Sequence, residues 1–87
     1  MGLIVRVNMF TATQTAYITG DNGDIEKTLT VNTESIDEDI LTICKEENIN
    51  SVIISGPMMY TKGFEKRIKQ AELTKYNTNT LNITLIK

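Results

Sequence analysis

The 87-residue sequence contains no histidine, no tryptophan and a single cysteine, Cys44. Without histidine the chain lacks the commonest general base and the usual nitrogen ligand for zinc. One cysteine cannot form an intramolecular disulfide, and small secreted domains generally depend on several. The composition therefore predicts a protein of the reducing cytoplasm, with no bound metal and no cofactor.

Long apolar runs and a strong excess of one charge are also absent. Met1–Val5 is apolar but is interrupted by Arg6, so it does not read as a signal peptide. No segment approaches the roughly 20 apolar residues that span a bilayer, which predicts no membrane association. The net charge of -2 argues against a dedicated DNA-binding domain, and an aromatic content of 6% argues against a base-stacking platform.

What the chain has in abundance is β-branched residues, since Thr, Ile and Val make up 29 of the 87 positions. Such residues favour sheet over helix bundle. The length allows one domain over residues 1–87. The richness in Asn, Ile, Thr and Lys suggests an AT-rich genome, such as that of a phage or another mobile element.

Hydrophobic periodicity predicts five strands and two helices. Asp21–Asp24 contains Asn-Gly, which is typical of a type I′ hairpin, and Ser35 with Glu38 forms a capping-box pattern before the first helix. The expected strands cover residues 3–10, 14–19, 25–31, 51–55 and 81–86, and the expected helices cover residues 36–47 and 63–75.

This order, βββαβαβ, predicts an α/β two-layer sandwich. A meander of three antiparallel strands precedes two right-handed crossovers, which gives a mixed five-stranded sheet of order 3-2-1-4-5. Both crossovers run in the same direction, so both helices are expected on one face. The residue pattern agrees, because one face of the expected sheet is apolar: Leu3, Val5, Val7, Ala16, Ile18, Leu29, Leu81, Ile83 and Leu85.

Two local patterns and this topology resemble a known core. Val7–Thr11 stands where one family ends its first strand with Asp-x-Gly/Ser-Thr, and Val52–Pro57 is similar to its fourth strand and small-residue loop. The family is the ribonuclease H-like superfamily, which includes Holliday-junction resolvases and actin-like kinases. Gly56–Thr61 also resembles the Gly-Pro loop of the tRNA-threonylcarbamoylation partner proteins. The resemblance implies the fold for nearly the whole chain.

The resemblance does not extend to the catalytic acids. The first-strand aspartate that holds Mg²⁺ in the family's nucleases is Asn8 here, and Ser55 and Gly56 stand where a second acid is expected. Two-metal phosphodiester cleavage needs clustered carboxylates. We therefore predict no enzymatic activity. A degenerate nuclease or nucleotide-binding fragment is the remaining catalytic alternative, and its Mg²⁺-dependent cleavage would depend on Asp21 or Asp24.

Three sets of polar or reactive residues have a functional and a purely structural interpretation. Asn8, Thr11, Ser55 and Gly56 are expected where open α/β sheets bind ligands, or they simply end two strands. Lys62, Lys66, Arg67 and Lys69 could form an anion or nucleic-acid patch, or they could complement the acidic first helix. Cys44 lies on an apolar helical stripe, which predicts an inert buried thiol.

The uncovered sheet face is the most informative feature. Five apolar residues are expected to project onto it, and no remaining segment can cover them: Ile4, Phe10, Tyr17, Ile53 and Ile86. Exposed apolar clusters mark partner surfaces, although scattered exposed apolar residues are normal. The strand over residues 81–86 could also be a bare edge able to pair with another chain.

The sequence therefore predicts a non-catalytic interaction protein, a homodimer or a protein that covers part of another. A phage accessory role would fit its size. The alternative is weak nucleic-acid binding through the basic second helix.

Overall fold

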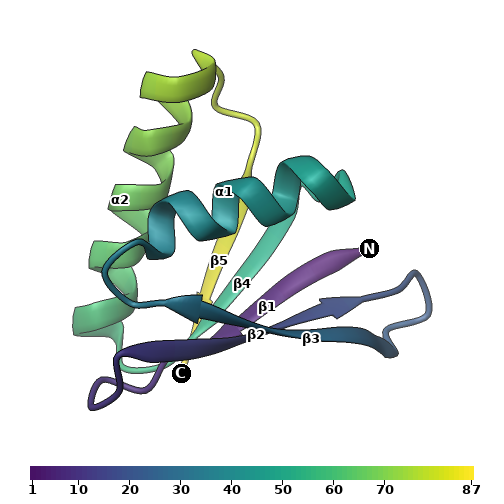
Figure 1. The fold of residues 1–87 in the computed structure, drawn as a ribbon, viewed down its shortest axis with the longest axis horizontal. Helices are drawn as coiled ribbons and strands as arrows, with labels where there is room; N and C mark the ends of the chain where they lie inside the picture. The colour runs from purple at the N-terminus through teal and green to yellow at the C-terminus, as the bar shows by residue number, and fades with distance from the viewer.

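The computed structural model describes all residues from 1 to 87 and contains the elements in the predicted order (Figure 1). The strands are β1 (Gly2–Arg6), β2 (Thr13–Thr19), β3 (Ile25–Asn32), β4 (Ser51–Ser55) and β5 (Asn82–Ile86), and the helices are α1 (Ile36–Glu47) and α2 (Met58–Tyr76).

The five strands form one mixed sheet of order β3-β2-β1-β4-β5, which confirms the predicted order and fold class. β2 is antiparallel to β1 and β3, whereas β4 is parallel to β1 and β5. Both helices pack against the same face of this sheet (Figure 1). The opposite face carries no element of the chain. Neither helix is long and apolar enough to cross a bilayer.

Alternation along the strands explains which face is covered. Leu3 and Val5 of β1, with Val52 and Ile54 of β4, are fully buried beneath the helices, and their neighbours in sequence are not. Each such burial stabilises the fold by about 1.5–3 kcal/mol. Each helix adds one stripe to the core: Ile36, Ile40, Leu41 and Cys44 from α1, and Ile68 from α2. The remaining core residues come from β2, β3 and the segments before β4 and β5: Ala16, Ile18, Val31, Ile49 and Leu81.

β1 is shorter than predicted. The expected strand ran to Phe10, but β1 ends at Arg6 and residues 8–12 form a loop. The Val7 amide still donates to the Ser55 carbonyl at 2.8 Å, and Asn8 then turns to meet the side chain of Gln14. The prediction was too long because apolar residues continue to alternate, at Val7 and Met9, after the backbone has left the sheet.

The first helix is not capped as predicted. Ser35 is the N-cap residue but makes no capping hydrogen bond; its hydroxyl donates to Asp39 instead, at 3.3 Å. Asp39 also accepts a hydrogen bond from the amide of Asn32 at 2.9 Å. Glu38 is drawn away from the helix end, since its carboxylate pairs with Lys75 of α2 at 3.7 Å.

The second helix and the hairpin also differ from expectation. α2 begins at Met58, five residues before the predicted Gly63, and it passes through this exposed glycine. The amides of Tyr60 and Thr61 donate to the Pro57 carbonyl at 2.9 and 3.1 Å, which starts the helix there. In the β2–β3 turn only Gly23 has a positive φ, of 86°, so the turn is not type I′, which needs two such residues. The Gly23 amide donates to the Gly20 carbonyl at 3.0 Å, and the pairing of β2 with β3 shifts register between Ile18 and Thr19, just before the turn.

Candidate functional site

Three of the predicted interface residues form a row across the centre of the uncovered face. Ile4 of β1 is paired with Tyr17 of β2 on one side and with Ile53 of β4 on the other. All three are half-buried although no element lies over them, because neighbouring side chains on the sheet shield them. Threonines bound the row at both edge strands, Thr28 on β3 and Thr84 on β5. The apolar part of this face is therefore narrow and central.

The next row toward the carboxyl end of β1 is more polar. Arg6 lies between Thr15 of β2 and Ser55 of β4, and Ile86 ends the row on β5, 45% exposed. Hydroxyl side chains are usual on a sheet face in contact with water. The arginine is the only charged side chain in the row.

Phe10 lies in the β1–β2 loop and not on a strand, and it is 90% exposed. It nevertheless borders the open face, because Phe10, Arg6 and Tyr17 line the same shallow depression, together with Met9 and Pro57. Four of the five predicted interface residues therefore lie on the uncovered face. The fifth, Phe10, lies beside that face, in the loop that follows the carboxyl end of β1.

A buried glutamine holds this loop in place. Gln14 is 3% exposed; its Oε1 accepts from the Asn8 amide at 2.6 Å, and its Nε2 donates to the Asn8 carbonyl at 2.9 Å and to Thr33 Oγ1 at 2.9 Å. The Phe10 amide donates to Asn8 Oδ1 at 3.1 Å. The loop that carries the most exposed aromatic residue is therefore fixed by hydrogen bonds.

The four predicted ligand-binding residues are not brought into one pocket. Asn8, Thr11 and Gly56 line three different depressions. Their polar groups serve the fold: the Thr11 hydroxyl donates to the Thr13 carbonyl at 2.6 Å, and the Gly56 amide donates to the Ile86 carbonyl at 3.0 Å. Ser55 accepts from Val7 through its carbonyl. This arrangement favours the structural interpretation of these residues.

The predicted basic patch on α2 is partly neutralised. Arg67 pairs with Asp37 of α1 at 3.1 Å and also donates to the Glu34 carbonyl at 2.7 Å. Lys69 lies 3.7 Å from Glu65. Lys62 and Lys66 are exposed and make no ion pair. The two helices lie side by side with complementary charges, although each exposed pair is worth at most about 1 kcal/mol.

The acids that a degenerate nuclease would need lie elsewhere. Asp21 and Asp24 belong to the β2–β3 turn, beside Gly2 at the amino end of β1 and so at the opposite end of that strand from Asn8. No three His, Cys, Asp or Glu side chains lie close enough together to hold a metal ion.

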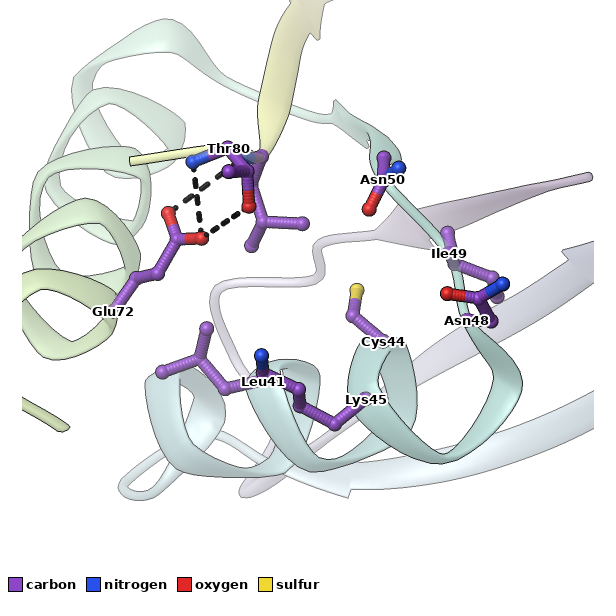
Figure 2. Close-up of a pocket in the computed structure, with 9 residues that line it drawn as sticks. Leu41, Cys44, Lys45, Asn48, Ile49, Asn50, Glu72 and Thr80 are labelled. Atoms are coloured by element: carbon purple, nitrogen blue, oxygen red, sulfur yellow. Dashed lines mark hydrogen bonds between the residues drawn. The ribbon is translucent and has the colours of Figure 1, made fainter. Parts of the chain in front are cut away.

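A small cavity of about 80 Å³ lies between α1, α2 and the segment that leads into β5 (Figure 2). Cys44 and Glu72 approach it from the two helices. Glu72 is only 2% exposed. Its Oε2 accepts hydrogen bonds from the Thr80 hydroxyl at 2.9 Å, the Thr80 amide at 3.1 Å and the Thr78 hydroxyl at 3.1 Å, and its Oε1 accepts from the Leu81 amide at 3.5 Å.

These contacts set the charge state of the cavity. Burial by itself would raise the pKa of Glu72, but the hydrogen bonds from Thr80, Thr78 and Leu81 outweigh burial and hold the pKa below its ordinary value. The pKa of Cys44 moves the other way, to about 11, because of burial and then the nearby charge of Glu72. The cavity therefore holds a carboxylate and a neutral thiol at pH 7.

Cys44 is expected to be unreactive in the folded protein, as its sequence position predicted. At pH 8 a thiol with a pKa near 11 is almost wholly protonated, so its alkylation by iodoacetamide should be at least about a hundredfold slower than in the urea-unfolded chain. Mass spectrometry of timed samples measures both rates. Native and unfolded rates within about tenfold of each other would contradict the buried, neutral state.

Two structurally important residues escaped sequence reasoning, Gln14 and Glu72. Gln14 sits at an inward position of β2, where alternation predicts an apolar side chain, and that mismatch is the available signal. Glu72 follows Ile68 by four residues and so shares its buried helical face. A polar residue on a core-facing stripe needs hydrogen-bond partners, but the sequence does not show which residues supply them.

A scan against models of known protein families finds no match, and a search of curated proteins finds no similar sequence. The functional argument accordingly depends on the geometry of this chain.

Proposed function

We propose that this protein is a non-catalytic interaction protein, and that its uncovered sheet face binds a second copy of the chain. The observation that carries this proposal is the row of Tyr17, Ile4 and Ile53 across three adjacent central strands, with no element over it. A single exposed apolar residue is ordinary, but a contiguous row gives a partner a continuous surface to cover.

The composition around the row supports an interface. Tyrosine and arginine are enriched where proteins meet, and charged residues are depleted from the centre of such contacts. Tyr17 lies in the row and Arg6 beside it, while the flanking positions carry threonine and serine. Packing two such faces would cover the apolar row and leave the hydroxyls at the margin.

The edge strand β5 supports a second form of the same function. β5, with the sequence Asn-Ile-Thr-Leu-Ile, contains no charge, proline or bulge. The other edge, β3, carries Glu26 and Lys27 and faces a register shift in β2. Charges and bulges protect sheet edges against pairing with other chains. Of the two edges, β5 is thus the one open to another strand.

The proposal is tested by sedimentation equilibrium of the wild type, Tyr17→Lys and Thr28→Lys. Thr28 lies in the same row on the exposed edge strand β3, so its substitution adds the same charge at the margin. We expect the wild type and Thr28→Lys to approach twice the chain mass of 9.8 kDa, and Tyr17→Lys to be monomeric. A monomeric wild type, or equal masses for all three, would overturn self-association through this face.

Nucleic-acid binding is a second candidate, favoured by the exposed Lys62 and Lys66, which have no acidic partner. It would be weak and non-specific, because the other two bases of the predicted patch are paired. Fluorescence anisotropy of a labelled single strand should then show binding that falls steeply with salt and is lost in a Lys62→Ala, Lys66→Ala double variant. No binding at 20 mM salt would remove this candidate.

The ribonuclease H-like relationship is likewise a proposal, supported by the shared order of elements and strands. An accessory role in a phage or mobile element rests on composition alone.

A further inference from the structure

Exposed apolar side chains lie at both ends of β1, near bases without an acidic partner at its carboxyl end and among acids at its amino end. Glu34, beside the β1–β2 loop, is an exposed acid at the carboxyl end. We propose that copies of this chain associate head to tail, the β1–β2 loop and start of α2 of one copy binding the acidic β2–β3 hairpin of the next. This inference goes beyond the open-face proposal, which joins two identical faces and does not use the hairpin, although Arg6 and Tyr17 border both surfaces.

The basic end is defined by bases that have no acidic partner. Four of the nine bases form ion pairs, namely Lys27, Arg67, Lys69 and Lys75, and Lys45 lies over the ring of Tyr76. The remaining four are Arg6, Lys62, Lys66 and Lys87. They lie at the carboxyl ends of β1 and β5 and in the first half of α2, so the unpaired positive charge of the molecule gathers at one end.

Exposed apolar side chains accompany these bases. Phe10 is 90% exposed, Met59 78% and Ile86 45%. The residues that line the two depressions meeting at Pro57 include Arg6 and Lys87 and no acid. An apolar centre with a basic rim is complementary to an apolar residue among acids.

The loop that presents Phe10 is ordered before any contact is made. Gln14 and Asn8 fix its backbone through the hydrogen bonds described above, and Thr33 Oγ1 donates to the Thr11 carbonyl at 3.1 Å. Presenting an aromatic side chain from a rigid loop lowers the ordering cost of binding. Aromatic anchors of this kind account for much of the affinity of protein interfaces.

The acidic end has the matching chemistry. Residues 20–26 contain Asp21, Asp24 and Glu26 and no base, and Ile25 is 60% exposed among them. Asp21 pairs with the Met1 ammonium at 3.1 Å, so Asp24 and Glu26 are the acids of this end without a basic partner. The turn is fixed by the Gly20 amide, which donates to the Asp24 carbonyl at 2.9 Å. This hairpin and the β1–β2 loop lie at opposite ends of the molecule (Figure 1). One copy can therefore offer both surfaces at once.

An interface between two different surfaces of the same chain is heterologous, and it forms rings or open filaments. Such an interface has a diagnostic property. Two variants that each lose one of the two surfaces cannot propagate alone, but a mixture retains one intact contact between them.

The experiment uses Phe10→Glu to remove the basic end, and Asp21→Lys with Glu26→Lys to remove the acidic end. All three side chains are exposed, and amide NMR spectra confirm that both variants are folded. We expect the mixture at 50 mM salt to sediment as a heavier species than either variant alone. The dissociation constant of the mixed complex should be at least tenfold lower than that for self-association of either variant. Raising the salt to 500 mM screens the charges and should return the sedimenting mass of the mixture to that of the separate variants.

NMR locates the contact. With the acidic-end variant labelled and Phe10→Glu added, shifts are expected for the amides of residues 8–11 and 58–62; with the labels exchanged, they are expected for residues 20–26. A mixture no heavier than its components, or shifts confined to Ile4, Tyr17 and Ile53, would overturn head-to-tail association. The second result would leave the open-face proposal standing. A heavier mixture that survives Ile53→Lys in both partners would support head-to-tail contact alone, because Ile53 lies in the open-face row and lines neither depression of the basic end.

Discussion

Replacing Glu72 by alanine is expected to lower the free energy of unfolding by about 3 kcal/mol. The carboxylate is buried and accepts hydrogen bonds from Thr78, Thr80 and Leu81. Hydrogen bonds to charged groups are worth about 1.5–3 kcal/mol, and a buried donor left without a partner costs about 1–3 kcal/mol. The substitution also frees the segment that leads into β5.

Urea unfolding followed by circular dichroism measures this loss, and the melting temperature should fall by about 15 °C for a chain of this size. Glu65→Ala is the matched control on the same helix. Glu65 makes only one ion pair, with Lys69 at 3.7 Å, so its loss should cost less than about 0.5 kcal/mol. Equal effects at the two positions would show that Glu72 does not organise the segment before β5.

The charge of Glu72 also makes stability depend on pH. Its pKa is lower in the folded than in the unfolded chain, so its contribution is present above the ordinary value of 4.5 and is lost as the pH falls below it. We expect the unfolding free energy of the wild type to decrease between pH 6 and pH 3 by more than that of Glu72→Gln. Parallel pH profiles for the two proteins would contradict a lowered pKa.

Gly56→Ala is expected to cost about 2 kcal/mol. Gly56 has a φ of 155°, which residues other than glycine rarely adopt. A Cβ there would lie 3.0 Å from Val7 Cβ and 3.2 Å from the Val7 carbonyl oxygen. Steric conflict with backbone and an unfavourable φ both oppose the methyl group. The strain would be located where β1 and β4 leave the sheet.

The same substitution at Gly63 provides the control. Gly63 lies within α2 and nothing approaches its Cβ position within 4 Å. Alanine is favoured over glycine inside a helix, so Gly63→Ala should raise stability by about 0.5–1 kcal/mol. Thermal unfolding of both variants gives the comparison. A Gly56→Ala variant as stable as the wild type would mean that the contact with Val7 is easily relieved.

The topology was predictable because several local signals agreed. The alternation of Leu3, Val5, Ala16 and Ile18 fixed which face of the sheet is buried, and the helical spacing of Ile36 and Ile40 fixed the covered face of α1. Short connections and right-handed crossovers then left one simple strand order, which the structure has.

The boundaries were less predictable because non-local contacts set them. Val7–Phe10 has the pattern of a strand, but the buried side chain of Gln14 binds the backbone of Asn8 and ends the pairing there. Gly63 reads as a helix boundary, yet the helix passes through it. Ser35 and Glu38 match a capping box, but Asp39 and Lys75 engage them instead.

The residues of the candidate site likewise include some that the sequence pattern placed correctly and others that it could not place. Ile4, Tyr17 and Ile53 were correctly placed on one face because strand alternation alone determines it. The position of Phe10 beyond the sheet depends on the loop and could not be read from the pattern. The pairing of Arg67 with Asp37 required the two helices to be placed side by side, which the topology predicted although the exact partners were not determined.

Self-association through the open sheet face is tested most directly by amide NMR spectra of the wild type in a dilution series from 1 mM to 20 µM. The account predicts concentration-dependent shifts centred on Ile4, Tyr17 and Ile53, with Thr28 at their margin, and their disappearance in Tyr17→Lys. Spectra that do not change with dilution and keep the narrow lines of a monomer at 1 mM, or changes confined to α1 or α2, would contradict the account.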